Sequence, residues 1–122
     1  MHRDGRAVAF IDWDGARPGP RRSDLGYSLW RFLRLGFPEG PGPEEAVHQL
    51  AVACDAYELE SRVALLGAIA EEQDRQRDWF LARQQAGDDD VLRVIEHGAL
   101  AYIDNARLWL REHQEALAAA LR

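Results

Sequence analysis

Two carboxylates that follow a short apolar run are the residues whose types and spacing best suit metal binding. Residues 7–11 (AVAFI) form a continuous apolar run, and Asp12 and Asp14 follow it. Such a run, bounded by turn-forming residues, predicts a strand buried on both faces. A carboxylate at a strand end can bind Mg²⁺, which takes one or two carboxylates together with substrate phosphates. A simpler interpretation is that Asp12 only caps a turn.

The elements that must position these carboxylates are predicted to be helical. Gly and Pro punctuate residues 15–20, which predicts a loop, and Ser23 or Asp24 then caps a first helix. The apolar face expected for this helix consists of Leu25, Leu29, Phe32 and Leu33, with Tyr27 and Trp30 nearby.

Three further helices are predicted from caps and apolar periodicity. Pro43 suits the first position of the second helix, and the third runs from about Ser61 to Arg83. Residues 88–90 (DDD) open the fourth helix, whose apolar stripe continues to Leu121. Acidic side chains crowd the third helix and are expected to form a solvated face; they are Glu71, Glu72, Asp74 and Asp78.

The predicted fold class is therefore mainly α, with one N-terminal strand followed by about four helices. The length of 122 residues suits a single domain, residues 1–122. A lone strand leaves backbone groups without partners, which is costly when the strand is buried. We therefore expect either pairing with a second chain, for example in a homo-oligomer, or a missing N-terminal half.

As a block, residues 10–16 (FIDWDGA), 18–20 (PGP) and 24–26 (DLG) resemble a segment of the aminoglycoside phosphotransferase and choline-kinase-like family. The resemblance is close over residues 7–35, and residues 54–57 (CDAY) are similar to the C-terminal helices of bacterial members. It implies the helical C-lobe of a protein-kinase-like fold. The chain would be a partial domain that starts after the catalytic loop.

The resemblance also implies residue roles and cofactors. Asp12 matches the aspartate that binds metal and nucleotide phosphates, and Asp14 would lie near the same metal. Asp24 matches a structural aspartate that braces the catalytic loop, an assignment compatible with a helix cap, and Trp13 matches a packing position. The cofactors would be Mg²⁺ and ATP, although this chain alone is not expected to retain them.

Several groups that this family needs for catalysis have no counterpart in the chain. All 15 basic side chains are Arg, so the Lys that contacts nucleotide phosphates is absent. The family's H-G-D-x-x-x-x-N segment is also absent. His2-Arg3-Asp4 imitates the protein-kinase H-R-D motif, but Ala9 stands where that motif requires Asn. We therefore predict no catalytic residue and leave open whether the chain is an enzyme.

Composition narrows the partners further. The formal net charge of −6 disfavours nucleic acid and suits a cationic small molecule or a basic protein surface. The resemblance implies a small cationic or hydroxylated substrate for the intact family. The apolar stretches are too short for a signal peptide or a membrane span, so we expect a cytoplasmic protein without membrane contact. Cys54 lies on an apolar helix face and is interpreted as a core residue.

The expected function is that of a C-terminal fragment of an ATP-dependent small-molecule hydroxyl phosphotransferase, inactive alone. An alternative from another class is a non-catalytic helical interaction module that pairs through its exposed strand or apolar helix faces. A third hypothesis is weak nucleotide binding through Asp12 and Mg²⁺. The acceptor is not defined by these residues.

Overall fold

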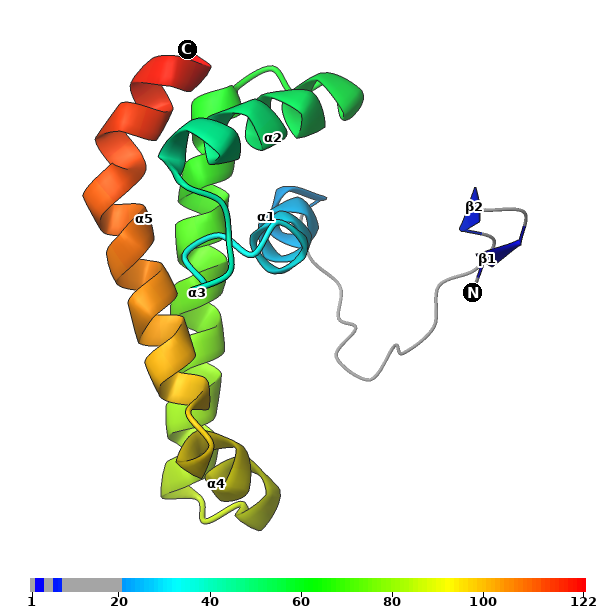
Figure 1. The fold of residues 1–122 in the computed structure, drawn as a ribbon. Helices are drawn as coiled ribbons and strands as arrows, with labels where there is room; N and C mark the ends of the chain where they lie inside the picture. The colour runs from blue at the N-terminus through cyan, green and yellow to red at the C-terminus, as the bar shows by residue number, and fades with distance from the viewer. Residues whose placement is uncertain (1, 4–5, 8–20) are drawn as a thin grey trace.

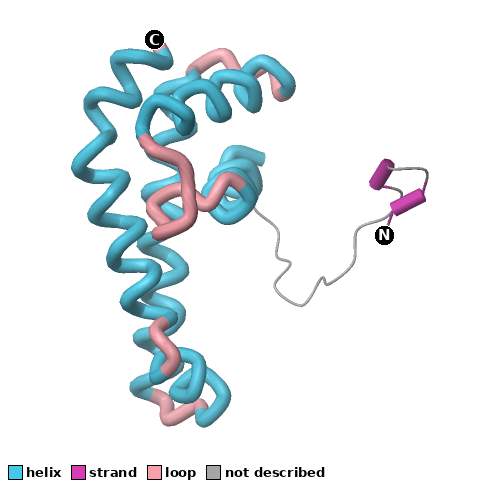
Figure 2. Tube along the Cα trace, in the orientation of Figure 1, coloured by secondary structure: helices cyan, strands magenta, loops and turns pink. Residues whose placement is uncertain are grey.

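The described residues form five helices and one short strand pair. The computed structural model describes residues 2–3, 6–7 and 21–122. The helices, shown in Figures 1 and 2, are α1 (Arg21–Phe32), α2 (Pro43–Ala56), α3 (Arg62–Gln85), α4 (Asp89–Glu96) and α5 (Ala99–Leu121). The mainly α class expected from the sequence is confirmed.

The N-terminal strand differs from the prediction. β1 (His2–Arg3) pairs antiparallel with β2 (Arg6–Ala7), so that His2 lies opposite Ala7. The strand expected over 7–11 is not seen: Ala7 belongs to the two-residue strand β2, and residues 8–11 lie outside the described residues. Because Ala7 has a partner in its own chain, the expectation of a lone strand was wrong at this residue.

The two longest helices organise the molecule. α3 and α5 run side by side, and α4 lies at the end of this pair opposite the C-terminus (Figure 1). α1 crosses α3 and makes the most extensive contacts with it, while α2 packs on α5. α3 therefore contacts α1, α4 and α5, and it forms the centre of the helical part.

Several helix boundaries follow from the caps that the sequence predicts. Pro43 starts α2, where the missing N–H costs no helical hydrogen bond. The Ser61 hydroxyl accepts a hydrogen bond from the Ala64 N–H at 3.3 Å and caps α3. The Asp88 carboxylate accepts hydrogen bonds from the N–H groups of Asp90 and Val91 and caps α4.

The predicted fourth helix is two helices in the structure. α4 ends at Glu96, and Gly98 adopts a φ of 102° before α5 begins at Ala99. This left-handed conformation is strained for residues with a Cβ and interrupts the helical hydrogen bonding. The apolar stripe continues across the break in sequence, which is why periodicity alone predicted one helix.

The core lies between α1, α2, α3 and α5. Its largest fully buried members are Trp30, Leu35, Leu50, Cys54, Leu65, Leu66, Ile69, Gln73 and Leu117. The predicted apolar face of α1 was wrong in part, because Phe32 is 84% exposed whereas Trp30 is fully buried. α1 is therefore rotated so that Leu25 and Trp30 face α3 and the core.

A glycine allows α1 to approach α3 closely. A Cβ on Gly26 would lie 2.9 Å from both the carbonyl carbon and the carbonyl oxygen of Ala68. Real Cβ atoms do not approach backbone this closely, so any side chain at position 26 would push the helices apart. Gly26 stands one helical turn before Trp30, and the close crossing therefore helps to seat the indole in the core.

We predict that Gly26→Ala lowers the free energy of unfolding by about 1–3 kcal/mol, as other overpacking substitutions do. Gly67→Ala is the matched control, because no atom lies within 4 Å of its added Cβ in the middle of α3. The control should instead raise stability by about 0.5–1 kcal/mol through helix propensity. Urea unfolding followed by circular dichroism measures both, and equal effects of the two substitutions would contradict the close crossing.

Candidate functional site

The sequence-predicted site is only partly covered by the structure. Asp12, Trp13 and Asp14 lie outside the described residues. Asp24 is described, but its predicted role as a helix cap was wrong, because α1 begins at Arg21 and Asp24 lies in the first turn, exposed. There its carboxylate is placed to interact favourably with the helix dipole.

The described residues offer no metal site of their own. Among them, no three His, Cys, Asp or Glu side chains gather closely enough to bind an ion together. Asp12 and Asp14, which the sequence predicts to bind Mg²⁺, lie outside the described residues, so their assignment stays a prediction. Both would supply hard oxygen donors of the kind that Mg²⁺ prefers.

The expected acidic face of α3 is only partly a solvated face. Glu72 is 3% exposed and forms an ion pair with Arg75, so it does not belong to the solvent-facing surface. Asp74 accepts a hydrogen bond from Arg107 Nε at 2.8 Å, which joins α3 to α5. Because two of the four acidic groups are engaged, a cationic ligand would have to compete with arginines that already hold them.

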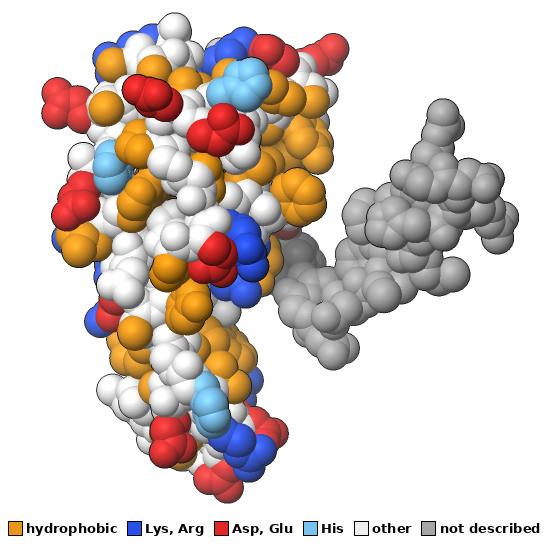
Figure 3. Space-filling view, viewed as in Figure 1, with side chains coloured by type: hydrophobic (Ala, Val, Ile, Leu, Met, Phe, Trp, Pro, Cys, Tyr) orange, Lys and Arg blue, Asp and Glu red, His pale blue; other side chains and the backbone are white. Residues whose placement is uncertain are grey.

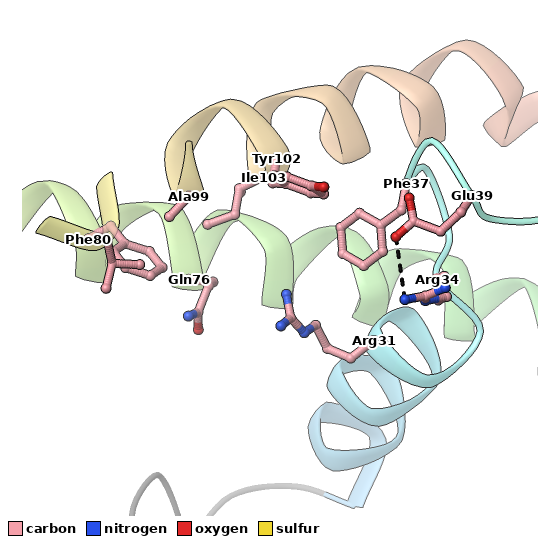
Figure 4. A pocket seen from close by; sticks show the side chains of 10 residues that line it. Arg31, Arg34, Phe37, Glu39, Gln76, Phe80, Ala99, Tyr102 and Ile103 are labelled. Atoms are coloured by element: carbon pink, nitrogen blue, oxygen red, sulfur yellow. Dashed lines mark ion pairs between the residues drawn. The ribbon is translucent and has the colours of Figure 1, made fainter. Parts of the chain in front are cut away.

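A groove beside the end of α1 is the clearest concave site among the described residues. Its volume is about 440 Å³, and its walls come from α1, the following loop, α3, α4 and α5. Figure 4 draws the side chains that line it and labels all but Val94; they are Arg31, Arg34, Phe37, Glu39, Gln76, Phe80, Val94, Ala99, Tyr102 and Ile103. Grooves of this size are large enough for a small organic ligand.

Two arginines give the groove its charge. The Arg31 guanidinium lies 5.6 Å from the ring centroids of both Trp30 and Phe37, within the range of cation–π contacts. Arg34 forms an ion pair with Glu39 at 3.4 Å, drawn as a dashed line in Figure 4. Because Glu39 compensates Arg34, the positive charge that remains in the groove is that of Arg31.

Aromatic rings form the apolar part of the groove. Phe37 and Tyr102 pack edge to face with their ring centroids 5.6 Å apart, and Phe37 also lies 6.2 Å from Trp30. Tyr102 is 47% exposed, so its ring is available to a ligand. The series Trp30, Phe37 and Tyr102 links the core to the groove.

Sequence reasoning missed this groove. The sequence alone indicates no binding role for Arg31, Phe37 or Tyr102. No motif spacing signals the site, because its residues come from separate elements that meet only in the folded chain. The one usable signal was the cluster of aromatic and Arg residues at 30–37 (WRFLRLGF), which combines both side-chain types at the end of a helix.

Two buried donors lack partners near the centre of the fold. Trp30 Nε1 and Gln73 Nε2 make no hydrogen bond among the described residues, although both side chains are at most 1% exposed. An unmade hydrogen bond of this kind costs about 1–3 kcal/mol. The contact of α1 with α3 is thus held by apolar packing and the close approach at Gly26 rather than by these polar groups.

Cys54 does not belong to a reactive site. Its side chain is 1% exposed in the core, which confirms its interpretation as a core residue. Burial raises the pKa of the thiol; Arg62 acts in the opposite direction, and Asp55 acts with burial. The neutral thiol is therefore the favoured form, and the nucleophilic thiolate is disfavoured.

Comparisons with known proteins identify no relative. No protein-family model, no curated protein and no solved structure matches the chain. The chain's helices give one further negative finding: none in the described part is both long and apolar enough to cross a bilayer.

We predict that Cys54 in the native protein reacts with a thiol reagent at pH 8 at least about 100-fold more slowly than in guanidinium, since thiolate formation requires exposure. The matched control is Cys54→Ala combined with Ala119→Cys, which places the only thiol at an exposed position of α5. Its native rate should approach the unfolded rate. Rapid native labelling of Cys54 would contradict the packing of α2.

The raised pKa of the Cys54 thiol also predicts how the stability of the fold depends on pH. Because the folded-state pKa of Cys54 is raised, the contribution of the neutral thiol to stability is complete below the unfolded-state pKa. It is lost as the pH rises through the folded-state value. The loss of stability at alkaline pH should therefore be smaller in Cys54→Ala than in the native chain.

Proposed function

We propose that the chain forms the helical, C-terminal part of a small-molecule hydroxyl phosphotransferase similar to the aminoglycoside phosphotransferases. The observation that carries the proposal is the block formed by residues 10–16 (FIDWDGA) and 24–26 (DLG). In this proposal the apolar run presents Asp12 to a metal ion, and α1 begins the helical subdomain. The mainly helical architecture after residue 20 agrees with such a subdomain.

The structure supplies a physical reason for one part of the block. The small residue that ends D-L-G is Gly26, and a Cβ there would lie 2.9 Å from Ala68. The preceding Leu25 is buried in the core. Gly26 therefore allows the close approach of α1 to α3, and Leu25 contributes to the core, so this part of the block has a packing role that agrees with the proposal.

The proposed chemistry assigns a limited role to the residues present. Asp12, with Asp14 nearby in sequence, would hold Mg²⁺ against the phosphates of ATP, and the ion would neutralise charge on the transferred phosphoryl group. Asp24 would support the fold at the start of α1. The chain contains no Lys and no H-G-D-x-x-x-x-N segment, so these 122 residues alone would not transfer phosphate.

A second candidate function rests on exposed apolar side chains of α1. Phe32 is 84% exposed and Tyr27 is 41% exposed, and they lie on the same helix. On the face drawn in Figure 3, apolar, acidic and basic side chains are otherwise interspersed. A large exposed ring favours contact with another protein surface, so α1 is the part of an interaction module that we would test first.

We predict that the purified chain turns over no ATP with aminoglycosides or simple alcohols as acceptors. The decisive experiment extends the chain with the coding sequence upstream of Met1 and measures phosphoryl transfer from radiolabelled ATP. If the proposal is correct, that sequence contains H-G-D-x-x-x-x-N in frame. Asp12→Ala should then reduce turnover by at least about 100-fold through loss of charge stabilisation.

Asp24→Ala in the extended protein is the matched control, because it removes a neighbouring carboxylate that is exposed on α1. Its turnover should fall much less than that of Asp12→Ala. Equal losses in the two variants would contradict the assignment of Asp12 as metal ligand. Robust turnover by the 122-residue chain, or an upstream region without the motif, would overturn the proposal.

For the interaction module, we predict that self-association measured by sedimentation depends on Phe32. Phe32→Ser should shift the chain to monomer, whereas Leu108→Ser should not, although Leu108 on α5 is also exposed, at 49%. Association that persists unchanged in Phe32→Ser would exclude α1 as the contact. A monomer at all concentrations would remove self-association from consideration.

A further inference from the structure

The groove beside α1 combines a shape and a lining that suit a small ligand. Its volume of about 440 Å³ lies within the usual range of ligand pockets, and its walls are supplied by separate elements of the fold. Figure 4 shows the Arg31 guanidinium extending from the end of α1 toward α3, the helix that carries Gln76, and both residues line the groove. A few polar groups among aromatic walls are typical of sites that orient a ligand.

The groove is locally positive in an acidic protein. Arg34 is compensated by Glu39 at 3.4 Å, whereas Arg31 has no carboxylate within ion-pair distance in the described part of the chain. The chain as a whole carries a formal charge of −6, so Arg31 is a positive site on a protein with a negative net charge. An anionic group is the complementary ligand for this position.

Arg31 is held in place by aromatic rings rather than by an acid. Its guanidinium lies 5.6 Å from the Trp30 and Phe37 centroids, and Trp30 is fully buried. A cation–π contact uses none of the N–H groups of the guanidinium, which can therefore donate hydrogen bonds to a ligand. A carboxylate is planar and accepts two such bonds, which matches this arrangement.

The remaining walls suit a flat apolar body. Phe37 and Tyr102 meet edge to face at 5.6 Å, and the half-buried Phe80 and the buried Ile103 continue the apolar lining. The Arg34–Glu39 pair adds no net charge to the lining, so Arg31 alone is left to pair with one negative group. The ligand chemistry that fits all of these features is one carboxylate attached to a flat, largely apolar group.

We propose that this groove binds a small aromatic monocarboxylate, with the carboxylate on Arg31 and the ring against Phe37 and Tyr102. This inference goes beyond the phosphotransferase proposal and does not rest on it. It predicts preference for anions over cations of the same shape, and it predicts that affinity falls as ionic strength rises.

The experiment compares three probes of nearly equal shape: 2-naphthoate, 2-naphthamide and 2-naphthylmethylamine. Binding to the full chain is measured by amide shifts in two-dimensional NMR and by calorimetry. We expect the acid to bind at least about 10-fold more tightly than the amide, because a charge-assisted pair replaces a neutral contact. The amine should bind most weakly, and shifts should concentrate at Phe37, Gln76 and Tyr102.

Substitutions separate the two parts of the site. Arg31→Gln should abolish the difference between acid and amide, whereas Arg111→Gln, at an exposed position of α5, should preserve it. Tyr102→Ala should instead weaken acid and amide by similar factors, since it removes ring contact and no charge. Melting curves check that each variant is folded at the temperature of the measurement.

Three outcomes would overturn the proposal. The first is equal affinity for acid and amide in the native chain. The second is retention of their difference in folded Arg31→Gln. The third is absence of shifts at the groove up to about 10 mM naphthoate, a concentration at which even weak specific sites fill.

Discussion

The close crossing of α1 over α3 is the contact on which most of the described structure depends. It is possible because Gly26 lets the backbone of α1 approach Ala68, with 2.9 Å between a hypothetical Cβ and the Ala68 carbonyl. The approach allows the indole of Trp30 to be fully buried one turn later. Trp30 and Phe37 in turn hold Arg31, so the groove depends on the packing of a glycine five residues before Arg31.

α3 connects this local contact to the rest of the helical part. It contacts α1, α4 and α5, and it contributes the buried Leu65, Leu66 and Ile69 to the core. Ion pairs join it to α5, with Arg77 to Asp104 at 2.7 Å and Arg107 to Asp74 at 2.8 Å. Because these charges are partly exposed, each pair contributes only about 0–1 kcal/mol, and the apolar core determines how the helices pack.

Local signals in the sequence predicted the starts of α2, α3 and α4, but neither the rotation of α1 nor the break between α4 and α5. Ser61 and Pro43 act within one turn of chain, so their caps are readable from the sequence. The burial of Trp30 in place of Phe32 depends on how α1 is rotated against α3, which no spacing within α1 determines. The helix break at Gly98 was not predicted, because the apolar periodicity continues on both sides of this left-handed residue.

The candidate sites also differ according to whether their residues are close in sequence or are brought together only by folding. Asp12, Asp14 and Asp24 could be proposed as candidates because they share one short segment, whereas Arg31, Gln76 and Tyr102 line one groove only through tertiary packing. Glu72 was expected on a solvated face, yet it is buried and paired with Arg75. An acidic run on a helix does not reveal which of its members the neighbouring helices will cover.

The two ends of α1 explain how opposite charges are arranged on one short helix. Asp24 lies in its first turn and Arg31 in its last, which is the distribution that complements the helix dipole. At exposed positions this interaction contributes about 0.3–1 kcal/mol per charge and requires no ion pair. The interaction of Arg31 with the helix dipole therefore stabilises α1 and leaves the N–H groups of the side chain available to a ligand. The same positive charge repels a polycationic ligand from the groove. If the chain does serve a kinase of the proposed class, an aminoglycoside-like acceptor would have to bind elsewhere, whereas a hydroxylated acid would meet no such repulsion.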